Sequence, residues 1–260
     1  MNSSARHITR SVAALLIAMP LTLSTAWAQN NAGDSSLTPS IEFSRPAVSG
    51  YDTYQWTVQV QELGSNPRPY WYWAQQSSFN QTGSFYFGLQ PNGALPNGQI
   101  GQMALFSFFG NGTSSSYSSC VTGADGGAGT SCHIPYAWVI GRNYTFSAQQ
   151  TATNPLAQTE TWTGTVTDGT TGATTVIGVV TVPSSWGLIA PGNVAWAEWY
   201  NGNISCASRT YISVLYNAPI GYYQGRPYQE TVTGTNPGTC ATYSINASAT
   251  QVLLKAGGSK

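Results

Sequence analysis

The sequence predicts an all-β protein, a two-sheet antiparallel β-sandwich of jelly-roll (concanavalin-like) type. From Ile41 onward, short segments of alternating apolar and polar residues are separated by Gly, Pro, Asn and Asp turn signals. No window outside the N-terminal segment repeats apolar residues with the helical period of 3.6. Because no linker or shift in composition interrupts this pattern, residues 41–260 are predicted to form one domain.

The first 28 residues have the organisation of a secretory signal peptide. Arg6 and Arg10 precede a short apolar stretch, and Ala26-Trp27-Ala28 gives the small-x-small pattern of a cleavage site. The apolar stretch is shorter than the roughly 20 residues that a membrane span requires. Residues 29–40 lack periodicity and are expected to form a flexible leader. We therefore predict a protein secreted to the periplasm or the cell exterior.

The charge pattern narrows the range of partners. Loss of the signal peptide removes two of the nine basic residues, so seven basic and nine acidic residues remain and the net charge is −2. Only 7% of all residues are charged, and the remaining Lys and Arg residues are scattered. Nucleic acids and anionic membranes require clustered basic residues, so neither is expected as a partner. We expect a monomer without a membrane span after signal removal, with a glycan or cell-surface polymer as its partner.

Four cysteines lie in the exported part of the chain: Cys120, Cys132, Cys206 and Cys240. An even number in an exported chain favours disulfides. Three pairings are open, and the local one joins Cys120 to Cys132 and Cys206 to Cys240. A zinc site is disfavoured because there is no CxxC pair and His133 is the one histidine of the exported part.

Strands are expected throughout residues 41–260. The segments with strand character are Tyr54–Gln61, Tyr70–Gln90, Met103–Phe109, Ile134–Val139, Asn143–Gln149, Thr159–Thr167, Thr174–Val182, Val194–Tyr200, Thr210–Tyr216, Tyr228–Thr233, Thr239–Ile245 and Thr250–Leu254. Two hairpins are predicted among them. One turns at Gly141-Arg142, and the other turns at the Asp-Gly signal that begins with Asp168.

The stretch Tyr70–Gln90 is expected to form two antiparallel strands that carry many aromatic and amide side chains. Trp71 and Trp73 share one strand face and Tyr72 takes the other, so both faces are aromatic. Aromatic rings either fill a core or provide platforms for sugar rings. The amides that are candidates to bind hydroxyl groups beside these rings are Gln75, Gln76, Asn80 and Gln90.

Glu198 is the acidic residue most suited to chemistry. In VAWAEWY it shares a strand face with Val194, Trp196 and Tyr200. A carboxylate among aromatic rings loses solvent and its pKa rises, which prepares it to act as a general acid. If the face is open to solvent, Glu198 lies in water beside ligand-binding rings. Pairing with Glu160 would give a glycosidase-like pair of carboxylates.

Several other chemistries are excluded or weakly indicated. His133 stands without a GxSxG serine, so a nucleophilic triad is not expected. No phosphate-binding glycine motif is present, and we expect no cofactor. Asp125 alone is insufficient for calcium, and Asp168 suits a turn, so we predict no metal site.

Two family resemblances add to this interpretation. The first depends on YWYWAQQ, GSFYFGLQPNG, ALFSFFG, the C-x11-C pair before IPYAWVIGRNYTF, TWTGTVTDGTTG, VIGVVTVPSSWG and WAEWYNGNISCA. In this order, between Pro69 and Ile220, they resemble an exported bacterial family of unknown function. The chain departs from the family pattern at Thr163–Val166. The resemblance implies an exported β-sandwich often found near carbohydrate-related modules, and it implies no activity or catalytic residues.

The second resemblance is to glutamic peptidases. These are exported sandwiches of comparable size with a catalytic Gln and Glu on inward-facing strands. Short fragments carry the similarity, namely Gln75 or Gln76 together with Glu198 in AEWY. It implies that the Glu acts as a base toward water while the Gln holds the oxyanion.

Three functions are compatible with the sequence. The first is binding of a neutral polar ligand, with a glycan as the leading candidate, in a groove lined by Trp71, Trp73, Gln75, Gln76, Trp196 and Glu198. The second is a hydrolase, either a glutamic-type peptidase or a glycosidase, with Glu198 as general acid and base and Gln76 or Gln75 as its partner. The third is a structural or adhesion protein.

Overall fold

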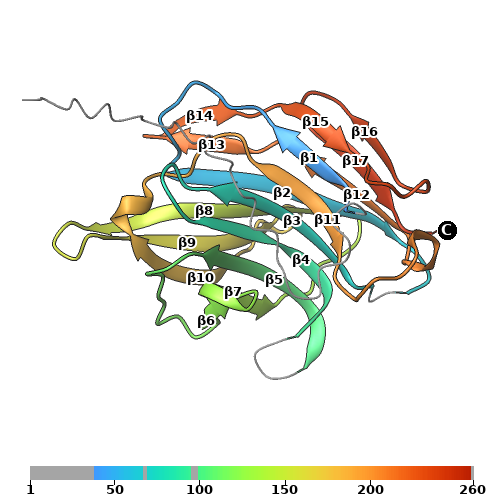
Figure 1. Ribbon diagram of the computed structural model, residues 1–260, viewed down its shortest axis with the longest axis horizontal. Coiled ribbons are helices and arrows are strands. Elements are labelled where there is room, and N and C mark those ends of the chain that lie inside the picture. Colours follow the sequence, from blue (N-terminus) through green and yellow to red (C-terminus); the bar gives the residue numbers. More distant parts are fainter. Residues whose placement is uncertain (1–37, 67–68, 95–98, 259–260) are drawn as a thin grey trace, which may run out of the picture.

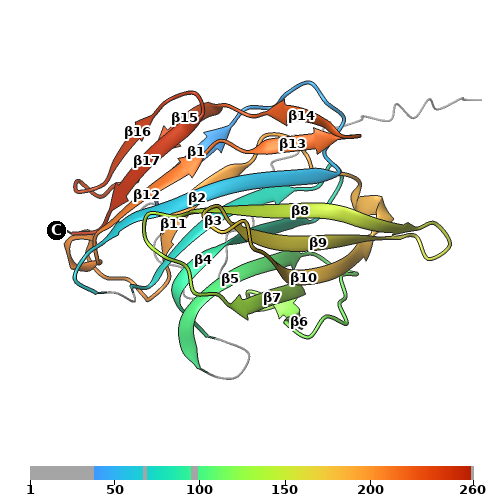
Figure 2. The same cartoon turned by 180° about the vertical axis from the view of Figure 1, so that it is seen from behind.

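The computed structural model describes residues 38–66, 69–94 and 99–258, which are built almost entirely of antiparallel β-strands. The predicted signal peptide and residues 29–37 of the predicted leader lie outside the described residues. The strands form two sheets that stack face to face, and Figures 1 and 2 each show one of the sheets in front. The predicted β-sandwich is confirmed.

The first sheet has eight strands and contains both halves of the Tyr70–Gln90 stretch. In spatial order its strands are β15 (Val232–Asn236), β1 (Ser40–Phe43), β11 (Val194–Trp199), β3 (Trp71–Ser78), β4 (Ser84–Ala94), β5 (Ile100–Phe109), β7 (Gly127–Pro135) and β6 (Cys120–Ala124). Strands far apart in sequence become neighbours here. In particular, β11 lies directly beside β3.

The second sheet has nine strands. Its main path runs through β10 (Thr174–Pro183), β9 (Thr159–Asp168), β8 (Asn143–Asn154), β2 (Thr53–Leu63), β12 (Ile212–Asn217), β17 (Gln251–Ala256) and β16 (Ser244–Ala247). A hairpin of β13 (Ile220–Tyr223) and β14 (Arg226–Gln229) pairs with the start of β2. The sheet therefore consists mostly of the strong alternating segments that the sequence predicts.

The core lies between the inner faces of the two sheets. Every second residue of β2, from Tyr54 to Val60, is buried, as the alternation predicts. Trp56 of the nine-stranded sheet stacks on Phe87 of the eight-stranded sheet, with ring centroids 5.9 Å apart. Offset stacking of this kind contributes about 0.5–1.5 kcal/mol per pair beyond burial. Aromatic side chains therefore provide much of the contact between the sheets.

Two glycines allow the sheets to approach closely at one side of the sandwich. A Cβ atom on Gly164 in β9 would lie 2.1 Å from the Phe106 ring of the opposite sheet. A Cβ atom on Gly178 in β10 would lie 2.4 Å from Cys132. Overpacking of a close-packed core costs about 1–3 kcal/mol, so both positions require glycine.

One predicted hairpin is wrong. The segments Ile134–Val139 and Asn143–Gln149 belong to different sheets, because β7 pairs with β5 and β8 pairs with β2. Strand β7 ends at Pro135, and the chain crosses to the other sheet while Trp138 inserts its ring against Trp73, with centroids 5.3 Å apart. The glycine at position 141 therefore turns a connection between sheets. The second predicted hairpin, β9 with β10, is confirmed.

Both local disulfides are confirmed. Cys120–Cys132 joins β6 to β7, and Cys206–Cys240 ties the short helix Cys206–Ser208 to the segment before β16. Each closes a loop that contributes on the order of 3 kcal/mol by the chain-entropy account. Paired cysteines fit an extracellular or periplasmic protein. Within the described ranges, no helix combines the length and the apolar character that a membrane crossing requires.

Candidate functional site

Strand β3 divides the predicted groove residues between two faces of the eight-stranded sheet. Trp71, Trp73 and Gln75 point inward and are completely buried in the core. They do not line a surface groove. Gln76 points to the outer face, as do Trp196 and Glu198 of the neighbouring strand β11. The sequence correctly predicted that Trp71 and Trp73 share one face of β3. That face packs against the other sheet and does not line a groove.

Gln75 has a structural role. Its amide donates hydrogen bonds to the Tyr54 hydroxyl at 2.7 Å, the Gln76 carbonyl at 2.9 Å and the Ser77 hydroxyl at 3.2 Å. These contacts satisfy a polar group that would otherwise be costly to bury. Gln75 therefore joins the two sheets through Tyr54 and is not available to a ligand.

A second apolar cluster covers the outer face of the eight-stranded sheet. We call it the outer-face cluster; it consists of Tyr72, Ala74, Tyr86, Met103, Leu105 and Trp196, with Phe109, Val194 and Tyr200 against it. The Tyr72 ring meets Tyr86 edge to face at 5.2 Å and Trp196 at 6.4 Å. The six residues are each at most 8% exposed, so they form a second small core on this face, and the neighbouring Glu198 of β11 makes the face the candidate site.

Glu198 lies at the edge of the outer-face cluster, directly opposite Tyr72 in the register of β11 and β3. The indole nitrogen of Trp196 donates to the Glu198 Oε2 atom at 3.3 Å. Desolvation by the surrounding rings raises the pKa of Glu198, although this indole hydrogen bond lowers it in part. The sequence predicted the face that Glu198 shares with Trp196, and it gave a raised pKa as one of two alternatives, the other being a carboxylate open to water.

Asp125 approaches the same cluster from the turn between β6 and β7. The Tyr86 hydroxyl donates to both carboxylate oxygens, each at 3.1 Å. Tyr86 belongs to β4, so the turn reaches back across β5 to make this contact. Asp125 is exposed as a residue, but partial desolvation of its carboxylate raises its pKa. Its charge is also close enough to raise the pKa of Glu198.

The Tyr72 hydroxyl is buried between these acidic groups. Desolvation raises its pKa strongly, and Tyr86, Asp125 and Glu198 each raise it further. Among the described residues this hydroxyl has no hydrogen-bond partner. An unpartnered buried hydroxyl costs about 1–3 kcal/mol. The hydroxyl therefore keeps its donor capacity within a ring that is only 3% exposed.

The strand register decides which amide shares a row with Glu198. Gln76 is opposite Val194, four residues along β11 from Glu198, which corresponds to about 14 Å along the strand. Leu89 of β4 pairs with Trp73 of β3, and the two strands are antiparallel. The next residue of β4, Gln90, therefore lies beside Tyr72, the residue before Trp73. It pairs with Met103 of the outer-face cluster. Gln90 and Glu198 therefore flank Tyr72, with Cα atoms about 10 Å apart across two strand spacings.

Three predicted partners of Glu198 are thus not brought to it. Gln76 shares its face but lies too far along the strand, and Gln75 is in the core. Glu160 lies on β9 of the other sheet. Burial raises the pKa of Glu160, but Glu160 does not act on Glu198. The acidic residue that raises the pKa of Glu198 is Asp125. Two other residues lie closer to Glu198. The register of β4 places Gln90 on the same face, and the turn after β6 brings Asp125 to it.

The most deeply buried carboxylate lies elsewhere. Glu230, between β14 and β15, accepts hydrogen bonds at Oε1 from the Tyr51 hydroxyl, the Gly192 amide and the Asn193 side chain. Burial raises its pKa to about 7. Among residues 38–66, 69–94 and 99–258, no three His, Cys, Asp or Glu side chains gather in an arrangement that would hold a metal ion.

The fold and site together define a β-sandwich with an aromatic cluster and a desolvated glutamate on the outer face of one sheet. No protein-family model matches the sequence, and no curated protein matches it significantly. A similar solved structure is that of SCP-B, a member of the eqolisin family of peptidases, in a complex with the tripeptide Ala-Ile-His. The TM-score is 0.44 at 12% identity, over 84% of this chain and 95% of that chain. This similarity is weak and carries no conclusion about activity.

Proposed function

We propose that the protein is a hydrolase that cleaves peptide bonds at the outer face of the eight-stranded sheet, with Glu198 as general acid and base. The observation that carries the proposal is the state of Glu198, which is desolvated and held by a single indole donor. A raised carboxyl pKa and unused acceptor capacity are the properties that a proton-transfer group needs.

In the proposed reaction, ionised Glu198 accepts a proton from a water molecule as that water attacks the carbonyl carbon. The Gln90 amide, in the same row, donates a hydrogen bond to the oxygen that becomes negatively charged. Glu198 then returns its proton to the leaving nitrogen as the C–N bond breaks. The free Tyr72 hydroxyl between the two residues is placed to hold the substrate.

Asp125 supports the acidic character of the site. Its negative charge raises the pKa of Glu198 further, so Glu198 retains its proton to a higher pH than it would without Asp125. This arrangement also provides the alternative of a glycosidase, which requires two carboxylates on either side of the scissile bond. The peptide reaction is favoured because an amide donor stands in the row of Glu198.

A second candidate function is binding of a neutral polar ligand such as a glycan at the same face, without hydrolysis. The three rings of the outer-face cluster and the half-buried amides of Gln76 and Gln90 favour it. However, Tyr72, Trp196 and Tyr86 are only 3%, 4% and 8% exposed, so they offer no broad stacking face to a sugar ring. The hydrolase is therefore the stronger proposal.

The test compares the protein with its Glu198→Gln variant on an unfolded protein and on insoluble polysaccharides, from strongly acidic to neutral pH. Glu42→Gln is the matched control, because Glu42 is exposed on β1 of the same sheet face, opposite Val194. We expect new amino termini from the unfolded protein with the wild type and the Glu42 variant, and none with the Glu198 variant.

Other results decide between the remaining functions. New reducing ends that depend on Glu198 would make the protein a glycosidase. Retention on a polysaccharide without products, unchanged in the Glu198 variant, would establish a binding protein. Peptide release that persists in the Glu198 variant would refute the proposed mechanism.

A further inference from the structure

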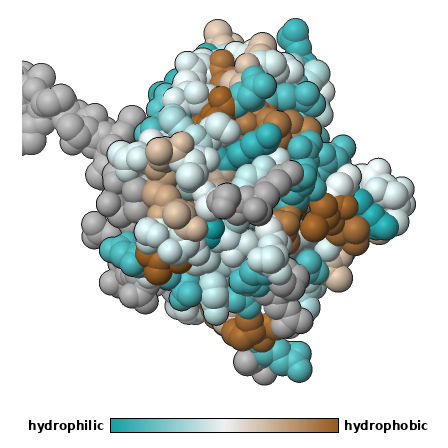
Figure 3. Space-filling view, turned by 90° about the vertical axis from the view of Figure 1, so that its right-hand side faces the viewer, coloured by the Kyte–Doolittle hydropathy of each residue, from teal (hydrophilic) through white to brown (hydrophobic). Residues whose placement is uncertain are grey.

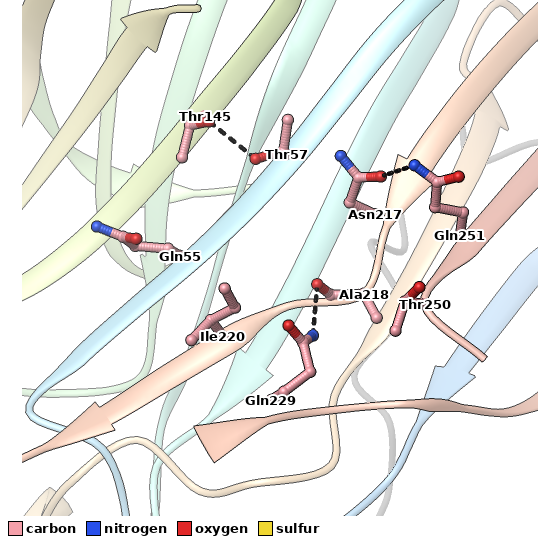
Figure 4. Close-up of a pocket in the computed structure, with 9 residues that line it drawn as sticks. All are labelled: Gln55, Thr57, Thr145, Asn217, Ala218, Ile220, Gln229, Thr250 and Gln251. Atoms are coloured by element: carbon pink, nitrogen blue, oxygen red, sulfur yellow. Dashed lines mark hydrogen bonds between the residues drawn. The ribbon is translucent and has the colours of Figure 1, made fainter. Parts of the chain in front are cut away.

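A separate pocket of about 280 Å³ opens on the nine-stranded sheet, on the far side of the sandwich from Glu198. Outward-facing residues of β2 and β8 form one wall, and the ends of β12, β14 and β17 form the other (Figure 4). Its volume is near the lower end of the range for small-molecule sites, about 300–1,000 Å³. It contains none of the residues assigned to hydrolysis.

The pocket lining carries no charged side chain, and polar and apolar atoms contribute about equally to it. Its amides and hydroxyls belong to Gln55, Thr57, Thr145, Asn217, Gln229, Thr250 and Gln251. Ala218 and Ile220 add apolar side chains. Such a lining disfavours ions, because no side chain in it compensates the cost of removing a charge from water. A ligand for this pocket must be neutral and must both donate and accept hydrogen bonds.

Gln229 provides a fixed acceptor. Its Nε2 atom donates to the carbonyl oxygens of Ala218 at 3.1 Å, Pro219 at 2.9 Å and Glu230 at 2.9 Å. These three contacts use the amide hydrogens and set the orientation of the group. The Oε1 atom of Gln229 consequently remains as an acceptor at the pocket.

A second amide pair provides both a donor and an acceptor. Gln251 Nε2 donates to Asn217 Oδ1 at 3.0 Å, and Figure 4 shows these two side chains pointing toward each other. The bond uses the oxygen of Asn217 and one hydrogen of Gln251. The Nδ2 group of Asn217 is then a donor, and the Oε1 atom of Gln251 is an acceptor.

The opposite wall adds further donors. The Tyr222 hydroxyl donates to Gln55 Oε1 at 3.3 Å, which leaves the Nε2 group of Gln55 as a donor. The hydroxyls of Thr57 and Thr145 are 2.8 Å apart, and since one must donate to the other, one hydroxyl hydrogen stays available. The pocket therefore offers both donors and acceptors, from amides that are already held by the protein.

We propose that this pocket binds a neutral saccharide, taking one sugar residue of a chain. Sugar hydroxyls donate and accept at the same time, as this lining demands, and the C–H face of a sugar suits Ile220. Because the amides are held by the protein before binding, little rotamer entropy is lost on complex formation. The proposal stands independently of hydrolysis at Glu198, since the two sites lie on different sheets.

The test is titration of cellobiose, maltose, lactose and N,N′-diacetylchitobiose, each separately, into the isotope-labelled protein carrying Glu198→Gln. The readout is the set of side-chain amide resonances of Gln55, Asn217, Gln229 and Gln251. The uncharged peptide N-acetyl-trialanine amide serves as the comparison ligand. We expect saturable shifts of these four amides with at least one disaccharide and none with the peptide.

Two variants locate the binding. Gln251→Ala removes an acceptor and frees Asn217, and we expect the Kd to increase about tenfold, the effect of one hydrogen bond of about 1.4 kcal/mol. Gln149→Ala is the matched control, an exposed glutamine of β8 on the same sheet, outside the pocket, and it should leave the Kd unchanged. The proposal is overturned if no disaccharide shifts these amides, if the peptide alone does, or if the shifts map to the outer-face cluster.

Discussion

Two glutamates with raised pKa values in this protein have different surroundings. Glu230 is fully buried, and three donors from two separate parts of the chain converge on one of its oxygens. Glu198 is half-buried on the outer face of a sheet and receives one hydrogen bond, from the indole of Trp196. Burial raises the pKa of both carboxyls.

The comparison shows that a raised pKa alone does not identify a catalytic group. Three donors, from Tyr51, Gly192 and Asn193, converge on Oε1 of Glu230, while its Oε2 has no partner among the described residues. These bonds hold the segment before β11 to the end of the β13–β14 hairpin. Glu198 keeps most of its acceptor capacity and faces a cluster that also contains the unpartnered Tyr72 hydroxyl. The number of protein donors distinguishes the structural carboxylate from the candidate catalytic one.

The largest expected effect is on catalysis. Glu198→Gln should lower kcat at least a thousandfold, about 4 kcal/mol of transition-state stabilisation, because the amide neither accepts nor returns a proton. The free energy of unfolding at pH 7 should change by less than about 1 kcal/mol, since few contacts depend on the charge. Initial rates and urea unfolding measure both quantities. A variant that loses activity together with its folded structure would assign Glu198 to the structural class.

The next effect concerns the pH dependence of stability and Glu230. Its pKa of about 7 in the folded protein exceeds the ordinary value of 4.5, so the folded state retains a proton that the unfolded chain releases. Stability from this group is complete below pH 4.5 and is lost as the pH rises through 7. The loss should be on the order of 3 kcal/mol. Glu230→Gln removes this dependence and keeps the Oε1 acceptor.

Urea unfolding of the wild type and the Glu230 variant at about pH 4.5 and about pH 8 measures the difference. We expect the wild type to lose more stability between these two values than the variant. Other carboxylates titrate equally in both proteins and cancel in the comparison. Equal losses in both proteins would mean that Glu230 ionises freely in the fold.

Gln90→Ala gives a smaller effect and tests the strand register. Loss of the proposed oxyanion donor should lower kcat by about 10- to 100-fold. Deletion of a single oxyanion donor in other enzymes lowers kcat by about 100- to 1,000-fold. Gln76→Ala should leave kcat unchanged, because Gln76 is about 14 Å along the strand from the row of Glu198. The ratio of the two kcat values is the measurement, and a larger loss for the Gln76 variant would reverse the assignment.

The face of Glu198 was predictable from the sequence because VAWAEWY alternates cleanly, and the strand β11 has that periodicity. The alternation around Trp71 and Trp73 was equally clear, but it did not show which face of β3 meets the other sheet, since both faces are aromatic. Local sequence defines two faces and does not choose the buried one. That choice depends on the pairing partner of the strand and on the sheet opposite.

The convergence of Asp125 with Glu198 was not predictable for a related reason. It depends on the strand order from β11 to β6 and on a turn that folds back over β5. In sequence Asp125 stands in a glycine-rich segment without a metal motif or strand pattern. The failed hairpin around Gly141 has the same cause, because a turn signal does not state whether the chain returns to the same sheet. Figure 3 shows one end of the molecule, where hydrophobic residues form separate small groups. The hydrophobicity of this surface therefore does not mark a binding site.

The smallest effect distinguishes partnered from unpartnered hydroxyls within the outer-face cluster. Tyr72→Phe removes a buried hydroxyl without a partner among the described residues, and should stabilise the protein by about 1 kcal/mol while it lowers activity through loss of a substrate donor. Tyr86→Phe removes the donor to both oxygens of Asp125, and should destabilise the protein by about 1 kcal/mol. The two substitutions delete the same atom from neighbouring rings, so area and volume changes cancel between them. Urea unfolding of both variants should give shifts of opposite sign. Shifts of the same sign would indicate that the Tyr72 hydroxyl already has a hydrogen-bond partner in solution and is not free to donate to a substrate.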